Sequence, residues 1–466
     1  MGGFFGVISK TDCVTELYYG TDYHSHLGTK RGGLALLGPK RIVREIHNIE
    51  NTQFRSKFEN DLVKLKGNAG IGVISDTDSQ PLIIHSHLGR YAIVTVGKIN
   101  NSEELINSAF AKRTAHFSEM SGGAVSQTEI VATLINQGNT FAEGIRRAQE
   151  SIKGSCSMLL LTDEGIYAGR DYYGRTPIII GSSDNSYCVT FETCAFLNLG
   201  FQYAYELGPG EVVKITAEGM EKQLPALDQL RICSFHWIYY GYPASTYEGQ
   251  NVEQVRYRCG TALAKRDETE VDMVSGIPDS GSAHALGYAH ETGLPYERPF
   301  VKYTPTWPRS FMPQNQKVRD LVAKMKLIPI KELIQNKRLL FCEDSIVRGT
   351  QLKDTIRRLY EYGAREIHMR PACPPLIFGC PYLNFSQSRS ELDLAARRAI
   401  VEMEDDTTTV PEAYTDPDSE AYHNMVEKIR ERLSLTTLKY QRLPYMVEAI
   451  GLPREKLCTF CWDGKG

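Results

Sequence analysis

The hydrophobic residues of this 466-residue chain follow one pattern up to about residue 230 and another after it. In the first part, short apolar runs rich in β-branched and small residues predict strands. They fall at 4–9, 33–37, 70–75, 92–98, 157–162 and 177–181. Helical spacing of apolar residues separates them, at 12–23, 51–65, 102–112, 127–137 and 140–151. This mixture predicts an α+β layered domain.

Beyond residue 230, single strands alternate with helices, which is typical of a parallel α/β sheet. Strands are expected at 270–275, 300–303, 339–342 and 366–370, and helices at 251–265, 350–364, 419–434 and 443–450. The stretch 402–422 is acidic and polar, and we expect an exposed or partly disordered insertion there.

The stretch LLFCEDSIVRGT, residues 339–350, combines a buried strand with two adjacent acids, Glu343 and Asp344, and a tight turn. A strand that turns into a helix presents backbone N–H groups and the helix dipole to a phosphate. Adjacent carboxylates would repel a bare anion, so they indicate a ligand that also carries hydroxyls or a divalent cation. A phosphorylated ribose meets both conditions. The alternative is an ordinary turn with a charged rim.

Composition excludes several classes of protein. Hydrophobic content of 42% and charged content of 23% are typical of soluble globular chains, and the length suggests two or three domains. A net charge of −3 predicts no nucleic-acid or acidic-membrane partner. Neither a membrane span nor a signal peptide is predicted, so we expect a cytoplasmic protein. Its eleven cysteines should then be thiols or metal ligands.

The motif at 339–350 resembles the signature of type I phosphoribosyltransferases, in which two acids hold the ribose hydroxyls of phosphoribosyl pyrophosphate (PRPP) and the turn holds its 5′-phosphate. Glu343 stands where that family usually has Asp. The resemblance implies a PRPP–Mg²⁺ site made by Glu343, Asp344, Ser345, Val347, Arg348, Gly349 and Thr350. A second turn, 278–281, resembles the pyrophosphate loop and adds Asp279, Ser280 and Gly281.

The first half resembles the glutaminase domain of the amidophosphoribosyltransferase family. The matching strings include GGFFGVISK, GIGV at 70–73, VGKINN at 96–101, QTEIVATLI at 127–135 and GRDYYGRTPIIIG at 169–181. The resemblance implies a class II glutamine amidotransferase-like domain over 1–230, with the N-terminal-nucleophile αββα fold. A type I phosphoribosyltransferase domain would cover 231–466.

Four positions depart from the glutaminase pattern. Gly2 stands in place of the nucleophilic cysteine, so the covalent route is closed. The family's carboxylate-binding arginine falls at Ile74 or Ser75, its oxyanion-hole asparagine at Val96 and its amine-binding acid at Gln127. We therefore predict that this domain does not hydrolyse glutamine.

The Pro-rich stretch 305–313 resembles the family's flexible loop, which closes over PRPP and excludes water. Arg309 is the expected phosphate contact in this loop, and Lys302 is a second catalytic candidate. Lys324 and Lys326 are further candidates. The alternative is that these lysines are ordinary surface residues, and 304–308 lacks the family's usual basic and glycine residues.

Four cysteines match places where some family members hold a [4Fe–4S] cluster: Cys233, Cys380, Cys458 and Cys461. Four thiolates with one C-x-x-C pair suit such a cluster, although zinc uses the same ligands. Idle thiols are the remaining alternative. Cys13 is predicted to be a core residue, and the pair His24 and His26 is expected to serve packing rather than metal binding.

The leading functional hypothesis is an amidophosphoribosyltransferase homologue of purine biosynthesis. It would bind PRPP–Mg²⁺ and transfer ammonia or an amine with release of pyrophosphate, without glutamine hydrolysis. Purine nucleotides are possible further ligands, and a homo-oligomer is expected. A second hypothesis is a non-catalytic regulatory paralogue that binds PRPP or nucleotides. A third is a phosphoribosyltransferase that uses a nucleobase or another amine.

Overall fold

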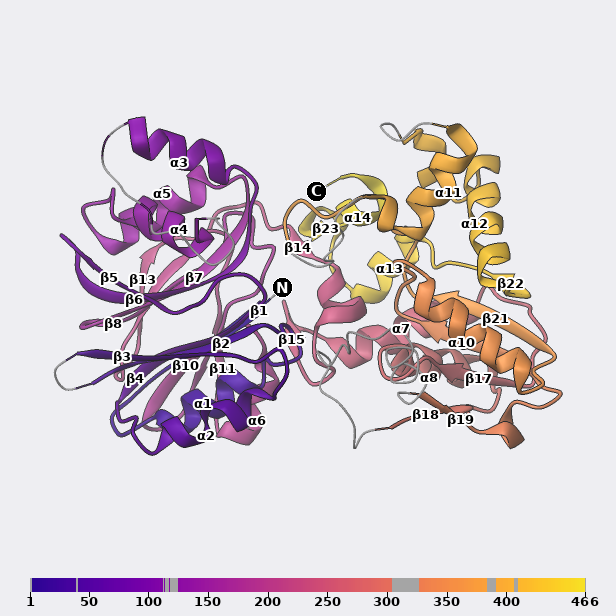
Figure 1. Ribbon diagram of the computed structural model, residues 1–466, viewed down its shortest axis with the longest axis horizontal. Helices are drawn as coiled ribbons and strands as arrows, with labels where there is room; N and C mark the ends of the chain where they lie inside the picture. Colours follow the sequence, from indigo (N-terminus) through magenta and orange to yellow (C-terminus); the bar gives the residue numbers. More distant parts are fainter. Residues whose placement is uncertain are drawn as a thin grey trace.

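The computed structural model describes residues 2–38, 41–111, 113, 117, 125–303, 327–383, 391–405 and 410–465. Two layered units lie side by side, and both marked termini lie near their junction (Figure 1). The strands of the first unit fall within residues 2–224, and the main sheet of the second within 273–438. None of the helices in the described ranges combines the length and the apolar character needed to cross a bilayer.

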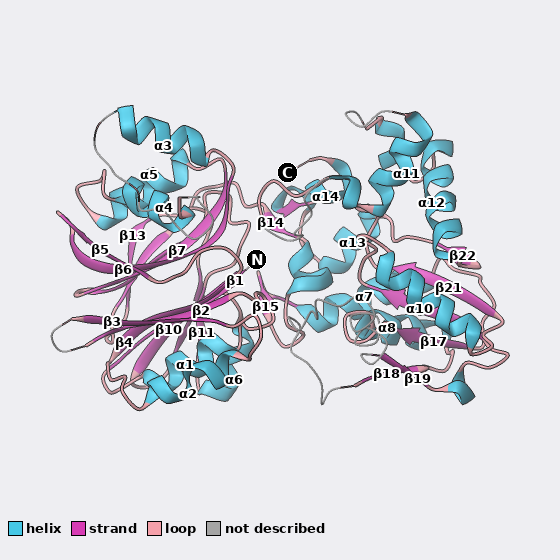
Figure 2. Cartoon of the chain, viewed as in Figure 1, coloured by secondary structure: helices cyan, strands magenta, loops and turns pink. Residues whose placement is uncertain are grey.

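The first unit is a sandwich of two antiparallel sheets (Figure 2). The seven-stranded sheet has the order β11-β9-β10-β1-β4-β2-β3. Its strands are β1 (Gly2–Ser9), β2 (Arg31–Leu37), β3 (Ile42–Asn48), β4 (Ala69–Ser75), β9 (Ile179–Ser182), β10 (Ser186–Thr190) and β11 (Gln202–Glu206). The six-stranded sheet has the order β13-β12-β8-β7-β6-β5. Its strands are β5 (Leu82–Ser86), β6 (Gly89–Ile99), β7 (Gly154–Thr162), β8 (Gly165–Gly169), β12 (Val212–Ile215) and β13 (Met220–Leu224).

Helices cover the outer faces of both sheets. On the seven-stranded sheet lie α1 (Val14–Asp22), α2 (Phe54–Leu62) and α6 (Phe196–Leu199) (Figure 1). On the six-stranded sheet lie α3 (Ser102–Ala111), α4 (Gln127–Ile135) and α5 (Phe141–Ser151). The space between the sheets is filled by inward-facing residues such as Phe4, Val73, Val94 and Leu161, which are almost fully buried. The predicted N-terminal-nucleophile αββα fold is confirmed.

The second unit holds a four-stranded parallel sheet of order β17-β20-β21-β22. Its strands are β17 (Met273–Gly276), β20 (Arg338–Glu343), β21 (Glu366–Pro371) and β22 (Thr437–Leu438). The helices around it are α7 (Val252–Ala264), α8 (Ser282–Thr292), α10 (Thr350–Glu361), α11 (Ala395–Glu404), α12 (Glu420–Leu433) and α13 (Leu443–Ile450). Strand β18 (Phe300–Lys302) pairs antiparallel with β19 (Leu327–Pro329). The predicted α/β phosphoribosyltransferase fold is likewise confirmed.

The acidic stretch 402–422 is more ordered than its composition predicts. It contains the end of α11, a 3-10 turn at Glu412–Thr415 and the start of α12, while 406–409 lies outside the described residues. Tyr414 and Tyr422 are buried in the core of the second unit. These two aromatic residues anchor a segment whose acids face outward, so its average polarity conceals its order.

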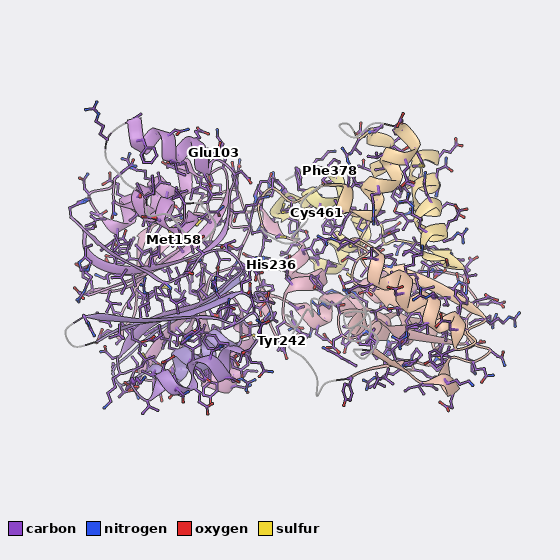
Figure 3. The ribbon with its side chains drawn as sticks, in the orientation of Figure 1. Glu103, Met158, His236, Tyr242, Phe378 and Cys461 are labelled. Carbon is purple, nitrogen blue, oxygen red and sulfur yellow. The ribbon has the colours of Figure 1, made fainter. Side chains whose placement is uncertain are left out.

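Segments far apart in the sequence meet at the junction. Strand β14 (Ile232–Cys233) pairs in parallel with β23 (Leu457–Cys458), followed by α14 (Phe460–Asp463). The hairpin of β15 (Thr246–Tyr247) and β16 (Gln250–Asn251) lies nearby. His236, Tyr242 and Cys461 mark this boundary (Figure 3). One continuous apolar cluster contains residues of both units, so they share a core.

Candidate functional site

The acids predicted to bind a sugar lie at the carboxyl end of β20, and both are buried. Asp344 is followed by a turn that ends at Gly349, whose φ of +74° lies in the left-handed region, and α10 begins at Thr350. Glycine adopts that conformation without the Cβ clash of other residues. The strand, turn and helix predicted from LLFCEDSIVRGT are therefore present.

The turn presents a row of unused hydrogen-bond donors. Among the described residues, none accepts a hydrogen bond from the backbone N–H groups of 346–352. The first N–H groups of a helix lack partners within it and lie at the positive end of its dipole. An anion of phosphate size is the ligand that such a turn binds.

The second predicted turn, between β17 and α8, packs against the first. The backbone N–H of Ile277 donates to the carbonyl of Cys342 over 3.0 Å, and Ser280 Oγ donates to Glu343 Oε1 over 3.2 Å. A Cβ at Gly281 would lie 2.2 Å from the Cys342 carbonyl oxygen, so only glycine permits this approach. The structure thus brings the predicted ribose acids and the predicted pyrophosphate turn together.

Charges around these turns are paired within the protein. Lys302 Nζ lies 2.5 Å from Asp279 Oδ2, and Arg348 lies 3.3 Å from Asp393. Burial, reinforced by the neighbouring charge of Asp344, raises the pKa of Glu343 well above its usual range. The proposed cations Arg309, Lys324 and Lys326, and the loop 305–313, lie outside the described residues.

A further buried cation near the acids escaped the sequence-based prediction. Arg256 of α7 is 4% exposed and donates to the carbonyls of Trp237, Tyr239 and Gly241 over 2.9–3.0 Å. Burial lowers the pKa of Arg256, and the charge of Asp344 opposes that shift, so the two groups interact. The sequence signal that could have identified Arg256 is its position on the apolar face of the helix predicted at 251–265.

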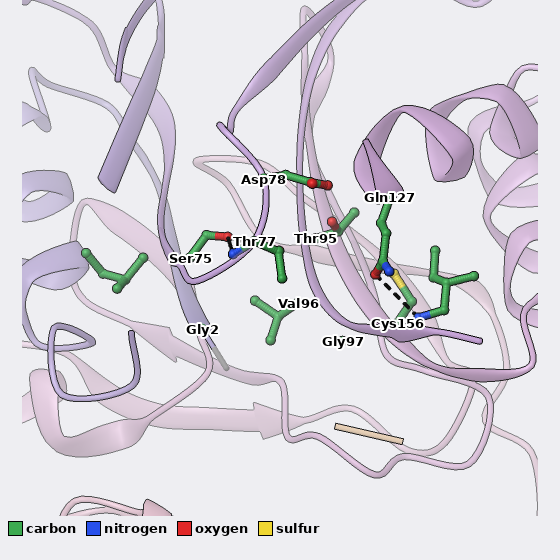
Figure 4. Close-up of a pocket in the computed structure, with 11 residues that line it drawn as sticks. Gly2, Ser75, Thr77, Asp78, Thr95, Val96, Gly97, Gln127 and Cys156 are labelled. Atoms are coloured by element: carbon green, nitrogen blue, oxygen red, sulfur yellow. Dashed lines mark hydrogen bonds between the residues drawn. The ribbon is translucent and has the colours of Figure 1, made fainter. Parts of the chain in front are cut away.

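The four positions that depart from the glutaminase pattern line one pocket in the first unit. Gly2, Ile74, Val96 and Gln127 come from β1, β4, β6 and α4, and Gly97 lies between them (Figure 4). The space in this pocket that is open to a water-sized sphere is about 20 Å³, enough for about one water molecule.

The polar groups of this pocket are engaged with one another. Gln127 Oε1 accepts from the backbone N–H of Ile99 over 3.4 Å (Figure 4). Asp78 Oδ2 accepts from Ser126 and Thr128. Cys156 is the thiol in the lining. Burial raises its pKa well above the usual range, so it is a protonated thiol rather than a nucleophilic thiolate.

The four cysteines predicted to bind metal converge at the junction. Cys233 lies opposite Cys458 in the β14–β23 pair, and Cys461 follows in α14. Cys380 belongs to the loop after β21; its thiol interacts with that of Cys461 and accepts from the backbone N–H of Leu383 over 3.4 Å. Hydrogen bonds from Cys461 and two backbone N–H groups, together with Lys98, lower the pKa of Cys380 to about 7.

The spacing of these sulfur atoms bears on the kind of metal. A single tetrahedral zinc with bonds of about 2.3 Å would hold the sulfur atoms about 3.8 Å apart. Among the described residues, no three of the four sulfur atoms lie within 4.8 Å of one another, whereas the ligand atoms of Glu45, His47 and Asp61 do. In that triad His47 and Asp61 form a partly exposed hydrogen bond of 2.6 Å.

Comparison with known proteins places both halves in one family. A family model described as a glutamine amidotransferase domain matches residues 68–198. The amidophosphoribosyltransferase of Mycobacterium bovis is 30% identical over 481 residues, which cover 99% of this chain and 85% of the relative.

The chain belongs to the amidophosphoribosyltransferase family.

Two further relatives agree with this membership. The amidophosphoribosyltransferase of Methanocaldococcus jannaschii is 28% identical over 100% of this chain and 97% of its own length. The solved structure of glutamine PRPP amidotransferase from Bacillus subtilis, complexed with ADP and GMP, matches with a TM-score of 0.85 at 28% identity. That match covers 99% of this chain and 96% of the other. This amidophosphoribosyltransferase homologue carries Gly2 where the family's glutaminase cysteine is expected.

We expect that the substitution Gly2→Cys does not give this family member glutaminase activity. A Cβ at Gly2 would lie 2.5 Å from the backbone oxygen of Ile74, and residues 74, 96 and 127 would remain Ile, Val and Gln. Release of glutamate from glutamine should stay at the level of the parent protein.

Gly219→Cys is the matched control, because no atom lies within 4 Å of a Cβ at Gly219. Glutamate release by Gly2→Cys at more than roughly tenfold the rate of this control, a difference of about 1.4 kcal/mol in the barrier, would contradict the expectation.

Proposed function

We propose that this protein binds PRPP with Mg²⁺ and transfers ammonia or an amine to it, with release of pyrophosphate. With ammonia the product is 5-phosphoribosylamine, the first intermediate expected of an amidophosphoribosyltransferase in purine biosynthesis. The observation that carries the proposal is the juxtaposition of Glu343 and Asp344 with the amide-lined turn and the 278–281 turn. Family membership supports the same assignment.

In this reaction, the lone pair of ammonia attacks the anomeric carbon as the bond from that carbon to the pyrophosphate oxygen breaks. Pyrophosphate leaves with the bonding electrons, and the new amine gives a proton to solvent. The protein's part is to orient the sugar, bind the leaving group and exclude water, and no protein nucleophile is needed. Asp344 and Glu343 would hold the ribose hydroxyls and the cation, and the amides of 346–352 would hold the 5′-phosphate.

Lys302 is proposed as a contact of the pyrophosphate. To bind the ligand, Lys302 must leave its ion pair with Asp279. Arg309 is proposed for the same role from the loop 305–313. Mg²⁺ would neutralise charge on the departing pyrophosphate.

We propose that the first unit does not hydrolyse glutamine and that the boundary between the units lies near residue 230. The substitutions at Gly2, Ile74, Val96 and Gln127, and the small pocket that they line, support this part of the proposal. The direct test is pyrophosphate release from PRPP with either ammonia or glutamine as the nitrogen donor. We expect turnover with ammonia alone; equal turnover with glutamine would refute the proposal.

We propose a [4Fe–4S] cluster on Cys233, Cys380, Cys458 and Cys461. Four convergent thiols, two of them in a C-x-x-C pair, form a ligand set for such a cluster. Zinc uses the same ligand set and is the alternative. An absorption band near ~400 nm in anaerobically prepared protein tests this assignment.

The binding of PRPP–Mg²⁺ should strengthen as the pH rises. The pKa of Glu343 is raised by burial, so a proton must leave before this carboxyl can bind a cation as a carboxylate. Working above pH 7 avoids the titration of the ligand phosphate, whose pKa is about 6. Calorimetric titration at pH 7.0, 7.75 and 8.5, in buffers of different ionisation enthalpy, counts the protons released.

Glu343→Gln should remove this pH dependence, whereas Glu361→Gln on the exposed side of α10 should retain it. A pH dependence that persists unchanged in Glu343→Gln would show that another group supplies the proton.

A second candidate function is a regulatory paralogue that binds PRPP or purine nucleotides without turnover. It is favoured by the internal pairing of Lys302 with Asp279 and of Arg348 with Asp393, which opposes ligand binding at those cations. Calorimetry with PRPP, ADP and GMP, followed by a pyrophosphate-release assay with several amines, separates the two functions. Size-exclusion chromatography with light scattering tests the expected homo-oligomer in the same preparation.

A further inference from the structure

Arg175 is a buried cation, and two of its guanidinium nitrogens lack a hydrogen-bond acceptor in the described part of the chain. Its side chain lies in the loop between β8 and β9, and the residue is 4% exposed. Within the described part of the chain, its Nε and Nη1 atoms have no acceptor. The guanidinium lies 3.5 Å from the ring centroid of Tyr382 and 4.9 Å from that of Tyr173. Buried guanidinium nitrogens without acceptors are costly, so a nearby anion would stabilise this arrangement.

The Arg175 guanidinium interacts electrostatically with two of the cysteines, Cys233 and Cys458. The Arg175 carbonyl accepts from the backbone N–H of Cys233 over 3.1 Å, and Cys233 pairs with Cys458 across β14 and β23. Tyr382, whose ring covers the guanidinium, follows Cys380 by two residues. Four cysteines that bind a metal do so as thiolates, which makes the loaded site anionic.

We infer that Arg175 is the charge partner of an anionic iron–sulfur cluster held by Cys233, Cys380, Cys458 and Cys461. This inference rests on the cluster proposed above, and assigns to Arg175 a positioning role rather than a catalytic one. Groups of this kind around a metal site usually change metal affinity 10–100-fold when they are removed.

A second cation of the same unit reaches the same loop. Lys98 of β6 donates from Nζ to the carbonyl of Cys380 over 3.1 Å, and Asn100 Nδ2 donates to the carbonyl of Pro381 over 2.5 Å. The ligating cysteines follow residue 230, whereas both cations precede it. The glutaminase-like unit therefore completes the electrostatic environment of the cluster, a role that does not depend on glutamine hydrolysis.

The test compares Arg175→Met with the parent protein in two states, cluster-free and reconstituted anaerobically with iron and sulfide. Arg175→Lys keeps the charge, and Arg147→Met removes an exposed arginine of the same unit as a matched control. The readouts are iron per chain, the ~400 nm band, its rate of loss in air and the melting temperature of each state.

We expect Arg175→Met to lose the band roughly tenfold faster than the parent. It should lower the melting temperature of the cluster-loaded protein but leave that of the cluster-free protein unchanged or raised, because an uncompensated charge has been removed. Arg175→Lys should restore much of the cluster's lifetime, and Arg147→Met should match the parent.

Two results would overturn the inference. Equal destabilisation of both states by Arg175→Met would show that Arg175 only supports packing. Failure of the parent protein to take up iron would show that it holds no iron–sulfur cluster, and Arg175 would then have no cluster to pair with. Pyrophosphate release with ammonia, measured in the same samples, reports separately on the proposed function, since that reaction has no step at the cluster.

Discussion

The substitution Asp344→Asn is expected to weaken the binding of PRPP–Mg²⁺ by roughly 100-fold. A carboxylate at this position would accept two hydrogen bonds from ribose hydroxyls, each worth about 1.5 kcal/mol because one partner is charged. A loss of about 3 kcal/mol corresponds to about two factors of ten in affinity. Asparagine has nearly the same shape, so the effect reports the lost charge rather than a cavity. Isothermal titration calorimetry with PRPP and Mg²⁺ measures the effect.

Asp354→Asn is the matched control for Asp344→Asn. Asp354 lies on the exposed side of α10, where it pairs with Arg357 over 3.2 Å, and its loss should leave PRPP affinity unchanged. If Asp344→Asn binds PRPP within about threefold of the parent, a difference below 1 kcal/mol, the assignment of the ribose site to Asp344 is wrong.

Arg370→Met is expected to destabilise the protein by about 3 kcal/mol. The Arg370 guanidinium is buried in β21, where it donates to the carboxylate of Asp267 and to Thr269 and Thr437. Removing it leaves the Asp267 carboxylate with one strong cationic contact, Lys439 Nζ at 2.9 Å. Breaking a buried ion pair usually costs 3–5 kcal/mol. Because Lys439 still pairs with Asp267, we expect a cost at the lower end of this range. Urea denaturation at pH 7 measures the loss.

The same variant should show a characteristic pH dependence. Burial alone would raise the pKa of Asp267, but Arg370 and several hydrogen bonds hold it well below its usual range. The stability that this carboxylate contributes is present above its unfolded pKa of about 3.9 and is lost as the pH falls below that value. The difference between variant and parent should therefore stay nearly constant from pH 7 to about pH 5 and shrink as the pH falls below about 4. Arg357→Met, which removes an exposed ion pair, should cost under about 0.5 kcal/mol at every pH.

Local chemistry made the strand, turn and helix of the proposed sugar-phosphate site predictable from the sequence. A short apolar run, two acids and a turn with glycine occur within residues 339–350, and the structure forms each element where the pattern places it. Helices of the first unit were also predicted within a few residues, because their apolar spacing is regular over two or three turns.

Strands with mixed or edge character were not predicted. Strand β3 is an edge strand with exposed Arg44 and Asn48, so it lacks a clear apolar alternation. Strands β5, β8 and β10–β13 were missed for related reasons, since they are short or interrupted by polar residues.

Contacts between distant segments were the other limit. The burial of Arg175 and Arg256 depends on segments that meet only in the folded chain, so composition and spacing could not place them. The resemblance to a family indicated four cysteines, but the pairing of Cys233 with Cys458 became visible only in the structure. The four positions that led to the prediction of an inactive glutaminase are far apart in the sequence, and only the structure shows that they line one pocket.

The β14–β23 pair has a consequence for biosynthesis of the protein. Cys458 is translated 225 residues after Cys233, which at about 5–20 residues per second takes roughly 11–45 s on the ribosome. During that interval the glutaminase-like sandwich can fold. Strand β14, which follows it in the chain, has no partner until β23 has been translated. We therefore expect ribosome-bound chains that are stalled before residue 457 to expose β14 to chaperones and proteases. This exposure should end only when β23 has left the ribosome and paired with β14.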